Sequence, residues 1–105
     1  MPSHSARRSR AADIVGTCVQ NNPKVQSWFL QVGIVPQLLR LLSDADAEVL
    51  AKALFALGSL VRNNSECLSA ARAAGAHAAV AGLAQHADIR VRWASPGSLL
   101  RWEIA

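Results

Sequence analysis

The sequence predicts an all-α fold in which helices stack as an armadillo-like right-handed α-solenoid of about two repeats with partial flanking helices. Hydrophobic residues recur at helical spacing over most of the chain, and Gly, Pro and Asn interrupt that spacing at regular places. The whole pattern then repeats after about 42 residues. A three-helix repeat of this length is typical of armadillo and HEAT solenoids, and a glycine between the first two helices favours the armadillo type.

Composition supports one helical domain that neither binds nucleic acid nor spans a membrane. The chain has 105 residues, of which 51% are hydrophobic and 5% aromatic, a balance that suits closely packed helices. The formal net charge is +4, but the densest basic cluster is only Arg7, Arg8 and Arg10, so no nucleic-acid partner is expected. No apolar run approaches the roughly 20 residues of a membrane span, and no apolar signal region is present. We therefore expect the cytoplasm, or also the nucleus.

The cysteines and histidines do not form the patterns that hold metals or cofactors. Cys18 and Cys67 lie within apolar helical patterns, so both are expected to be reduced core thiols. No histidine approaches either cysteine at zinc-ligand spacing, and neither a phosphate-binding glycine loop nor a Ser-His-Asp arrangement is present. The sequence therefore predicts a protein without cofactor or metal that is not an enzyme.

Helix boundaries follow from the residues that interrupt the apolar stripes. Residues 1–9 lack periodicity and are expected to be a flexible N-terminal segment. Pro23 and Pro36 suit the first turns of helices, and Asp46 is expected to cap the longest helix. Helices are expected at 10–21, 23–32, 36–42, 47–64, 66–74, 76–84 and from 88 onward.

A single shift of the sequence against itself superposes the two units without a gap, and we call this alignment the repeat register. The superposed pairs include Gly16 with Gly58, Asn21 with Asn63, Gly33 with Gly75, and Asp46 with Asp88. The repeat region is expected to cover 10–93, as a fragment of a longer solenoid, because a Ser-Pro-Gly sequence interrupts the third long helix soon afterwards. Residues 94–105 do not match the register and are expected to be a divergent C-terminal tail.

The longest helix, 47–64, presents two different arcs when its residues are placed at about 100° intervals. Apolar side chains form the first arc, which should hold the array together: Leu50, Ala53, Leu54, Leu57, Leu60 and Val61. A mixed arc lies opposite and consists of Glu48, Lys52, Phe55, Ser59 and Arg62. Because the long helices line the concave surface of an armadillo solenoid, the second arc should face a partner.

Equivalent polar residues on the first helix extend this candidate binding surface. They are Arg10, Asp13, Thr17, Gln20 and Asn21, with Asn63 at the end of the longest helix. Asn21 and Asn63 have two interpretations, as helix C-caps or as hydrogen-bonding groups for the backbone of an extended peptide. Phe55 either packs on a neighbouring repeat or contacts a partner directly.

Tryptophans are expected in two different environments. Trp28 should take part in core or inter-helix packing. Trp93 and Trp102 should face solvent after the interrupted third unit. Exposed aromatic residues at an uncapped end favour self-association of the solenoid.

Two sequence blocks resemble a known family. The blocks IVGTCVQNNPKVQSWFLQVG and VLAKALFALGSLVRNN are similar to the armadillo-repeat nucleotide exchange factors of heat-shock protein 70 chaperones, the heat-shock-protein-70-binding protein family. The resemblance implies that the chain binds the nucleotide-binding domain of heat-shock protein 70 on its concave face and promotes ADP release. The family has further repeats and an N-terminal helical cap. Two alternatives to this function stay open. The chain is either a generic armadillo scaffold that binds an extended peptide or a truncated relative without exchange activity.

Overall fold

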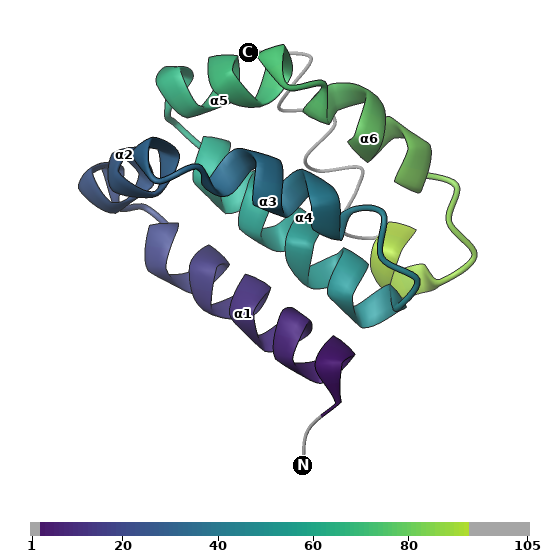
Figure 1. The fold of residues 1–105 in the computed structure, drawn as a ribbon. Coiled ribbons are helices and arrows are strands. Elements are labelled where there is room, and N and C mark those ends of the chain that lie inside the picture. Colours follow the sequence, from purple (N-terminus) through teal and green to yellow (C-terminus); the bar gives the residue numbers. More distant parts are fainter. Residues whose placement is uncertain (1–2, 93–105) are drawn as a thin grey trace.

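The computed structural model describes residues 3–92, and these residues form a helical assembly without strands (Figure 1). The helices are α1 (His4–Val19), α2 (Pro23–Gln31), α3 (Ile34–Leu41), α4 (Ala47–Val61), α5 (Ser65–Ala73) and α6 (Ala76–Leu83), followed by a helical turn at 89–92. No helix in this described region is long and apolar enough to cross a membrane. The all-α prediction is confirmed for the described residues, whereas the expectations for Trp93, Trp102 and 94–105 lie outside them.

The first helix begins at His4, so the expected start at Arg10 was wrong. Ser3 caps the helix, because its Oγ accepts a hydrogen bond of 3.1 Å from the backbone N–H of the third helical residue. One turn later, Arg8 Nε donates to Asp44 Oδ2 at 2.7 Å. The cap and the ion pair hold these first turns in place, although they carry no apolar stripe by which the sequence alone could reveal a helix.

Each of the two Asn-Asn pairs ends one helix and starts the next. Asn21 and Asn63 have positive φ angles of 56° and 54°, the left-handed conformation that commonly follows a helix C-terminus. The second residue of each pair caps the following helix: Oδ1 of Asn22 and of Asn64 accept backbone hydrogen bonds of 3.2 and 3.0 Å. The C-caps of α1 and α4 are Gln20 and Arg62, so Asn21 and Asn63 lie one residue beyond the predicted capping position, where they form the left-handed turn that leads to the next helix.

Helix boundaries repeat in the same register as the sequence. The start of α5 follows the start of α2 by a fixed number of residues, and the start of α6 follows the start of α3 by the same number. The lengths also agree, at nine residues for α2 and α5 and eight for α3 and α6. Gly33 and Gly75 precede α3 and α6 with φ angles of 84° and 86°, which only glycine adopts without strain. Helices α1 and α4 are therefore the same element in successive units.

Equivalent hydrogen bonds close the turn before α4 and the turn before residues 89–92. Asp44 Oδ1 accepts from the Asp46 backbone N at 2.9 Å, and His86 Nδ1 accepts from the Asp88 backbone N at 3.0 Å. Oδ1 of Asp46 and of Asp88 then accept from the backbone N two residues later, at 2.9 and 2.8 Å. The predicted cap at Asp46 is confirmed. Its counterpart Asp88 caps the helical turn at 89–92 in the same way.

Helix α4 lies at the centre of the fold, packed against α1, α3 and α5 (Figure 1). Ten of its 15 residues are buried, so it has little free surface. All six residues of the predicted apolar arc are at most 4% exposed, which confirms that arc. Ser59 was predicted on the opposite, partner-facing arc, but it is only 7% exposed. Gln26 of α2 covers this position and donates a 3.0 Å hydrogen bond to the Ser59 carbonyl.

Two further expectations about burial were wrong. Trp28 is 57% exposed and meets the ring of Phe29 edge to face, with 5.0 Å between ring centroids. Cys18 is exposed, whereas Cys67 is buried as expected, and burial raises the pKa of the Cys67 thiol. Helical spacing indicates which residues share a stripe, but not whether another helix covers that stripe.

Candidate partner-binding face

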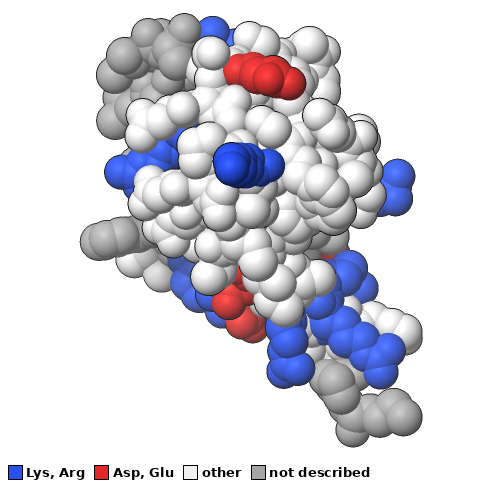
Figure 2. Space-filling view, turned by 90° about the vertical axis from the view of Figure 1, so that its left-hand side faces the viewer, with Lys and Arg blue, Asp and Glu red and all other residues white. Residues whose placement is uncertain are grey.

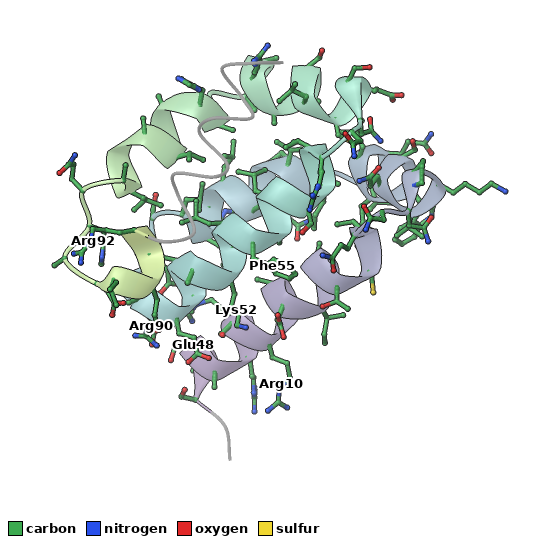
Figure 3. The ribbon with its side chains drawn as sticks, turned by 180° about the vertical axis from the view of Figure 1, so that it is seen from behind. Arg10, Glu48, Lys52, Phe55, Arg90 and Arg92 are labelled. Atoms are coloured by element: carbon green, nitrogen blue, oxygen red, sulfur yellow. The ribbon has the colours of Figure 1, made fainter. Side chains whose placement is uncertain are left out.

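The long helices present a common surface at the back of the molecule, which we call the partner face. Figure 3 shows α1, α4 and the turn at 89–92 side by side on this surface. The side chains labelled on it are Arg10 from α1, Glu48, Lys52 and Phe55 from α4, and Arg90 and Arg92 from the last turn. Because these elements hold equivalent places in successive units, the face is built from the same helix position each time.

An ion pair crosses the partner face between α1 and α4. Lys52 Nζ lies 3.3 Å from Asp13 Oδ1, and the two side chains are 38% and 47% exposed. An exposed pair of this kind contributes at most about 1 kcal/mol. It therefore orients the two side chains more than it holds the helices together, and the ammonium group keeps other donors for a partner.

The last described turn brings two arginines to the same face. Arg90 forms a bidentate contact with Asp88, with Nε to Oδ1 at 3.1 Å and Nη2 to Oδ2 at 3.0 Å. These hydrogen bonds lower the pKa of Asp88 to about 2 and raise the pKa of Arg90. The negative charge of Glu48 on α4 acts on Arg90 in the same direction. Arg92 donates to two carbonyls of the preceding turn at 3.0 and 2.8 Å, so its guanidinium supports that turn.

The ring of Phe55 packs on α1 at Gly16. A Cβ atom at Gly16 would stand 2.5 Å from Cδ2 of the ring, closer than real Cβ contacts allow. The ring is also partly exposed. Phe55 thus packs between the two long helices, and its remaining exposed part lies on the partner face beside Lys52.

The structure places most of the predicted binding residues where a partner could reach them. The exposed residues are Arg10, Thr17, Gln20, Asn21, Glu48, Arg62 and Asn63, and the partly exposed ones are Asp13, Lys52 and Phe55. Within residues 3–92, the guanidinium groups of Arg10 and Arg62 form no ion pair or hydrogen bond, so both are available to acidic groups of a partner. Ser59 is buried and is excluded from the face. A contact between the others and a partner stays a prediction.

Sequence reasoning missed three residues that matter here. Arg90 and Arg92 lie on the partner face, and the repeat register places Arg90 at the position of Glu48. Gln26 is only 2% exposed, and its amide joins α2 to the end of α4. The register gives a signal for Gln26 as well, because its counterpart is the buried apolar residue Leu68.

Comparisons with known proteins identify relatives of this chain. The family described as SIL1/FES1/HPBP1 C-terminal domain matches residues 2–89. Hsp70 nucleotide exchange factor FES1 of Gibberella zeae is 50% identical over 58 residues, which cover 53% of this chain and 27% of that protein. Hsp70-binding protein 1 of Homo sapiens is 50% identical over 56 residues, 52% of this chain and 16% of that protein. FES1 of Coccidioides immitis is 45% identical over 62 residues, 58% of this chain and 29% of that protein.

The chain thus spans less than a third of the length of these relatives. No solved structure matches it. The family match covers nearly all of the described helices, from α1 through α6. The chain therefore belongs to the SIL1/FES1/HPBP1 C-terminal domain family.

Proposed function

We propose that this chain binds Hsp70 chaperones through the partner face and acts as a nucleotide exchange factor. The observation that carries the proposal is the family match over residues 2–89, together with relatives named as Hsp70 nucleotide exchange factor and Hsp70-binding protein. The match includes α1 and α4, which contribute most of the partner face, and it ends at residue 89, just before Arg90 and Arg92. The chain is a co-chaperone in this proposal and performs no bond chemistry, so it is not an enzyme.

The proposed mechanism is a shift of population in the chaperone. A protein that binds an open nucleotide-binding domain more tightly than a closed one raises the fraction of open molecules. An open domain holds ADP less firmly, so ADP leaves and ATP enters. The contribution of this chain is a preformed surface in which side chains from α1, α4 and the turn at 89–92 are already aligned.

We further infer that the helices form an armadillo-type solenoid whose concave side is the partner face. Three observations support this assignment: α5 and α6 have the same lengths as α2 and α3, they begin at the same offset from them, and a left-handed glycine precedes both α3 and α6. We also propose that the chain acts in the cytoplasm, or also in the nucleus.

The basic side chains on the partner face indicate which groups the contacted surface of Hsp70 should carry. Arg10 is unpaired within the described residues, and Lys52 has only an exposed partner. Acidic side chains of Hsp70 would gain charge-assisted hydrogen bonds with both. The alternative function, a scaffold for an extended peptide, draws on Asn21 and Asn63, but their left-handed backbone already accounts for asparagine at these positions.

Release of a fluorescent ADP analogue from Hsp70 tests the proposal. The folded chain should accelerate release, and Lys52→Glu should weaken binding about tenfold by reversing one charge on the partner face. Lys24→Glu is the matched control, because Lys24 is an exposed lysine on α2, which does not contribute to the partner face.

Two results would contradict the proposal. A folded chain that binds Hsp70 without accelerating release is a binding module and not an exchange factor. Equal loss of activity in Lys52→Glu and Lys24→Glu would place the contact away from the partner face. Circular dichroism spectra of both variants establish that they are folded.

A further inference from the structure

The turn between α3 and α4 carries an exposed serine whose hydroxyl group has no role in the fold. Ser43 lies in the segment 42–46, which belongs to no helix, and its backbone N donates to the Arg40 carbonyl at 3.2 Å. The hydroxyl group forms no hydrogen bond with the residues that the structure describes. Because the residue is exposed, an enzyme can reach this hydroxyl from solvent.

Carboxylates follow this serine at every second position. Asp44, Asp46 and Glu48 come one, three and five residues after it, and residues 41–51 contain no Lys or Arg. Among the serines and threonines of the chain, only Ser43 has an acidic residue three positions later. A protein kinase with a basic substrate groove selects such a hydroxyl, because the Lys and Arg residues of its groove form charge-assisted hydrogen bonds with the carboxylates.

Two of these carboxylates keep free acceptors in the folded chain. Asp46 caps α4 through Oδ1 alone, so Oδ2 accepts no hydrogen bond within the described residues. Glu48 is exposed, and its carboxylate accepts none from this part of the chain either. Asp44 differs, because Arg8 donates to both of its oxygens. A kinase can therefore contact the third and fifth positions after the serine while the cap of α4 stays in place.

Comparison with the second unit shows that the turn does not need a serine for its own geometry. In the repeat register, Gln85 takes the place of Ser43 and His86 takes the place of Asp44. Equivalent backbone hydrogen bonds nevertheless close the two turns, at 2.9 and 3.0 Å. Because the turn also forms with glutamine, the fold does not explain the hydroxyl group of Ser43.

We propose that Ser43 is a phosphorylation site for an acidophilic protein kinase and that its phosphate weakens binding at the partner face. In the reaction, Ser43 Oγ attacks the γ-phosphorus of ATP, the bond from that phosphorus to the β,γ-bridging oxygen breaks, and ADP leaves. The hydroxyl proton passes to a carboxylate of the kinase. The site rests on the turn alone, whereas the effect on binding rests on the exchange function proposed above.

The phosphate would lie beside the basic end of α1. Basic residues gather at the lower end of the molecule in Figure 2, the end at which α1 begins with Arg7, Arg8 and Arg10. Arg8 donates to Asp44, the neighbour of Ser43, at 2.7 Å, so the turn is in contact with this basic end. A phosphate carries about two negative charges at neutral pH. It would offset the positive charge that attracts acidic groups of Hsp70 to Arg10 on the partner face.

Incubation of the folded chain with casein kinase 2, an acidophilic kinase, and with ATP and Mg²⁺ tests the site. Mass spectrometry of the fragments should locate one phosphate on Ser43 and none in Ser43→Ala. Asp46→Asn should slow the reaction at least about tenfold, because it removes the charge at the third position while asparagine still caps α4. Asp88→Asn is the matched control: it makes the same replacement at the equivalent cap, so the rate at Ser43 should stay unchanged.

Three outcomes would overturn the site. The first is a phosphate on other hydroxyl groups and not on Ser43. The second is an equal loss of rate in Asp46→Asn and Asp88→Asn, which would mean that the acidic turn is not recognised. The third is a reaction that occurs only after urea has unfolded the chain. Circular dichroism spectra of the variants establish that they are folded.

Release of a fluorescent ADP analogue from Hsp70 tests the effect on binding. Half-maximal acceleration should need about three- to tenfold more phosphorylated chain than unmodified chain, and this difference should shrink as salt is raised. Kinase-treated Ser43→Ala should act like the unmodified chain. Equal activity of the phosphorylated and unmodified chains would show that the phosphate does not regulate the partner face. If the unmodified chain does not accelerate release, the exchange function and its regulation both fail, while the mapped phosphate still decides the site.

Discussion

The ring of Phe55 occupies the space that a side chain at Gly16 would need. A Cβ atom there would lie 2.5 Å from ring atom Cδ2 and 3.1 Å from Cα of Ala56. The missing side chain lets α1 and α4 approach closely, and the ring then fills the space beside the contact. The spacing of the two long helices is thus set by one glycine and one aromatic residue.

Gly16→Ala should destabilise the fold by about 1 kcal/mol, because overpacking costs about 1–3 kcal/mol and the gain in helix propensity returns about 1 kcal/mol. In a Phe55→Ala background the same replacement should cost less, since the ring is gone and only the contact of 3.1 Å with Cα of Ala56 is left. Urea unfolding of the four proteins in this cycle measures the difference between the two backgrounds. Gly82→Ala is the matched control: a Cβ there meets nothing within 4 Å, so it should stabilise α6. If Gly16→Ala changed the free energy of unfolding equally in both backgrounds, the contact between position 16 and the Phe55 ring would make no contribution to stability.

Gln26→Ala should lower the free energy of unfolding by about 2–4 kcal/mol, because it leaves buried polar groups unpaired. The Gln26 amide donates to the carbonyls of Ser59 and Arg62 at 3.0 and 3.3 Å, and it accepts from Asn64 Nδ2 at 3.0 Å. Chemical denaturation measures the loss. Gln31→Ala provides the control, since Gln31 is exposed on the same helix and should change stability little. A similar loss for both variants would mean that the hydrogen bonds of Gln26 are unimportant.

The contribution of the Arg8–Asp44 pair should depend on pH. The Arg8 hydrogen bond is the main cause that lowers the pKa of Asp44 below its ordinary 3.8. A carboxyl group whose pKa is lower in the folded state stabilises the fold above pH 3.8, and this stabilisation is lost as the pH falls through the folded-state pKa. Arg8→Ala should therefore cost about 0.5–1 kcal/mol at neutral pH and progressively less in acid.

Unfolding curves at a series of pH values measure this dependence. Arg10→Ala is the control, because Arg10 lies on the same helix and forms no ion pair within the described residues. A loss in Arg8→Ala that stays constant from neutral pH into acid would indicate that Arg8 acts through packing and not through the Asp44 carboxylate.

Asn63 should tolerate glycine but not alanine. Its φ of 54° is strained for a residue with a Cβ atom, and asparagine lowers that strain only in part. Asn63→Gly should leave stability unchanged within about 0.5 kcal/mol, whereas Asn63→Ala should cost about 1 kcal/mol. Thermal melts distinguish the two variants. If alanine were harmless here, the left-handed turn after α4 would not be required for the fold.

Local sequence features were sufficient to predict most of the helix ends. Proline, glycine and the capping Asp and Asn residues act within a few positions of the chain, so Pro23, Gly33 and Asp46 could be interpreted without knowledge of the tertiary structure. The start of α1 was missed although Ser3 is a local cap, because the residues that follow it carry no apolar stripe. Their tertiary contact, from Arg8 to Asp44, joins residues 36 positions apart. The sequence alone does not indicate which distant carboxylate will form an ion pair with a surface arginine.

Burial was predicted well on one side of α4 and less well elsewhere. The apolar arc is buried as its spacing predicts, whereas Ser59, a polar residue on the opposite arc, is also buried, and its carbonyl accepts a hydrogen bond from Gln26 of α2. Cys18 and Trp28 show the opposite case, since their apolar stripe is not covered by another described helix. A helical wheel assigns faces to one helix, but the neighbours of that helix decide which faces are buried.

The matching helix lengths and turns make residues 23–64 a self-contained building block. This block begins with Pro23 at the first turn of α2 and ends with Asn64, the residue that caps α5. A duplicate inserted between Asn64 and Ser65 would create a junction in which asparagine again precedes a helix that starts with proline, as it does at Asn22. Both ends of the molecule would keep their sequences while the array grew by three helices. We therefore expect that the array can be lengthened by copying residues 23–64, because every turn between helices in the longer chain already exists in this one.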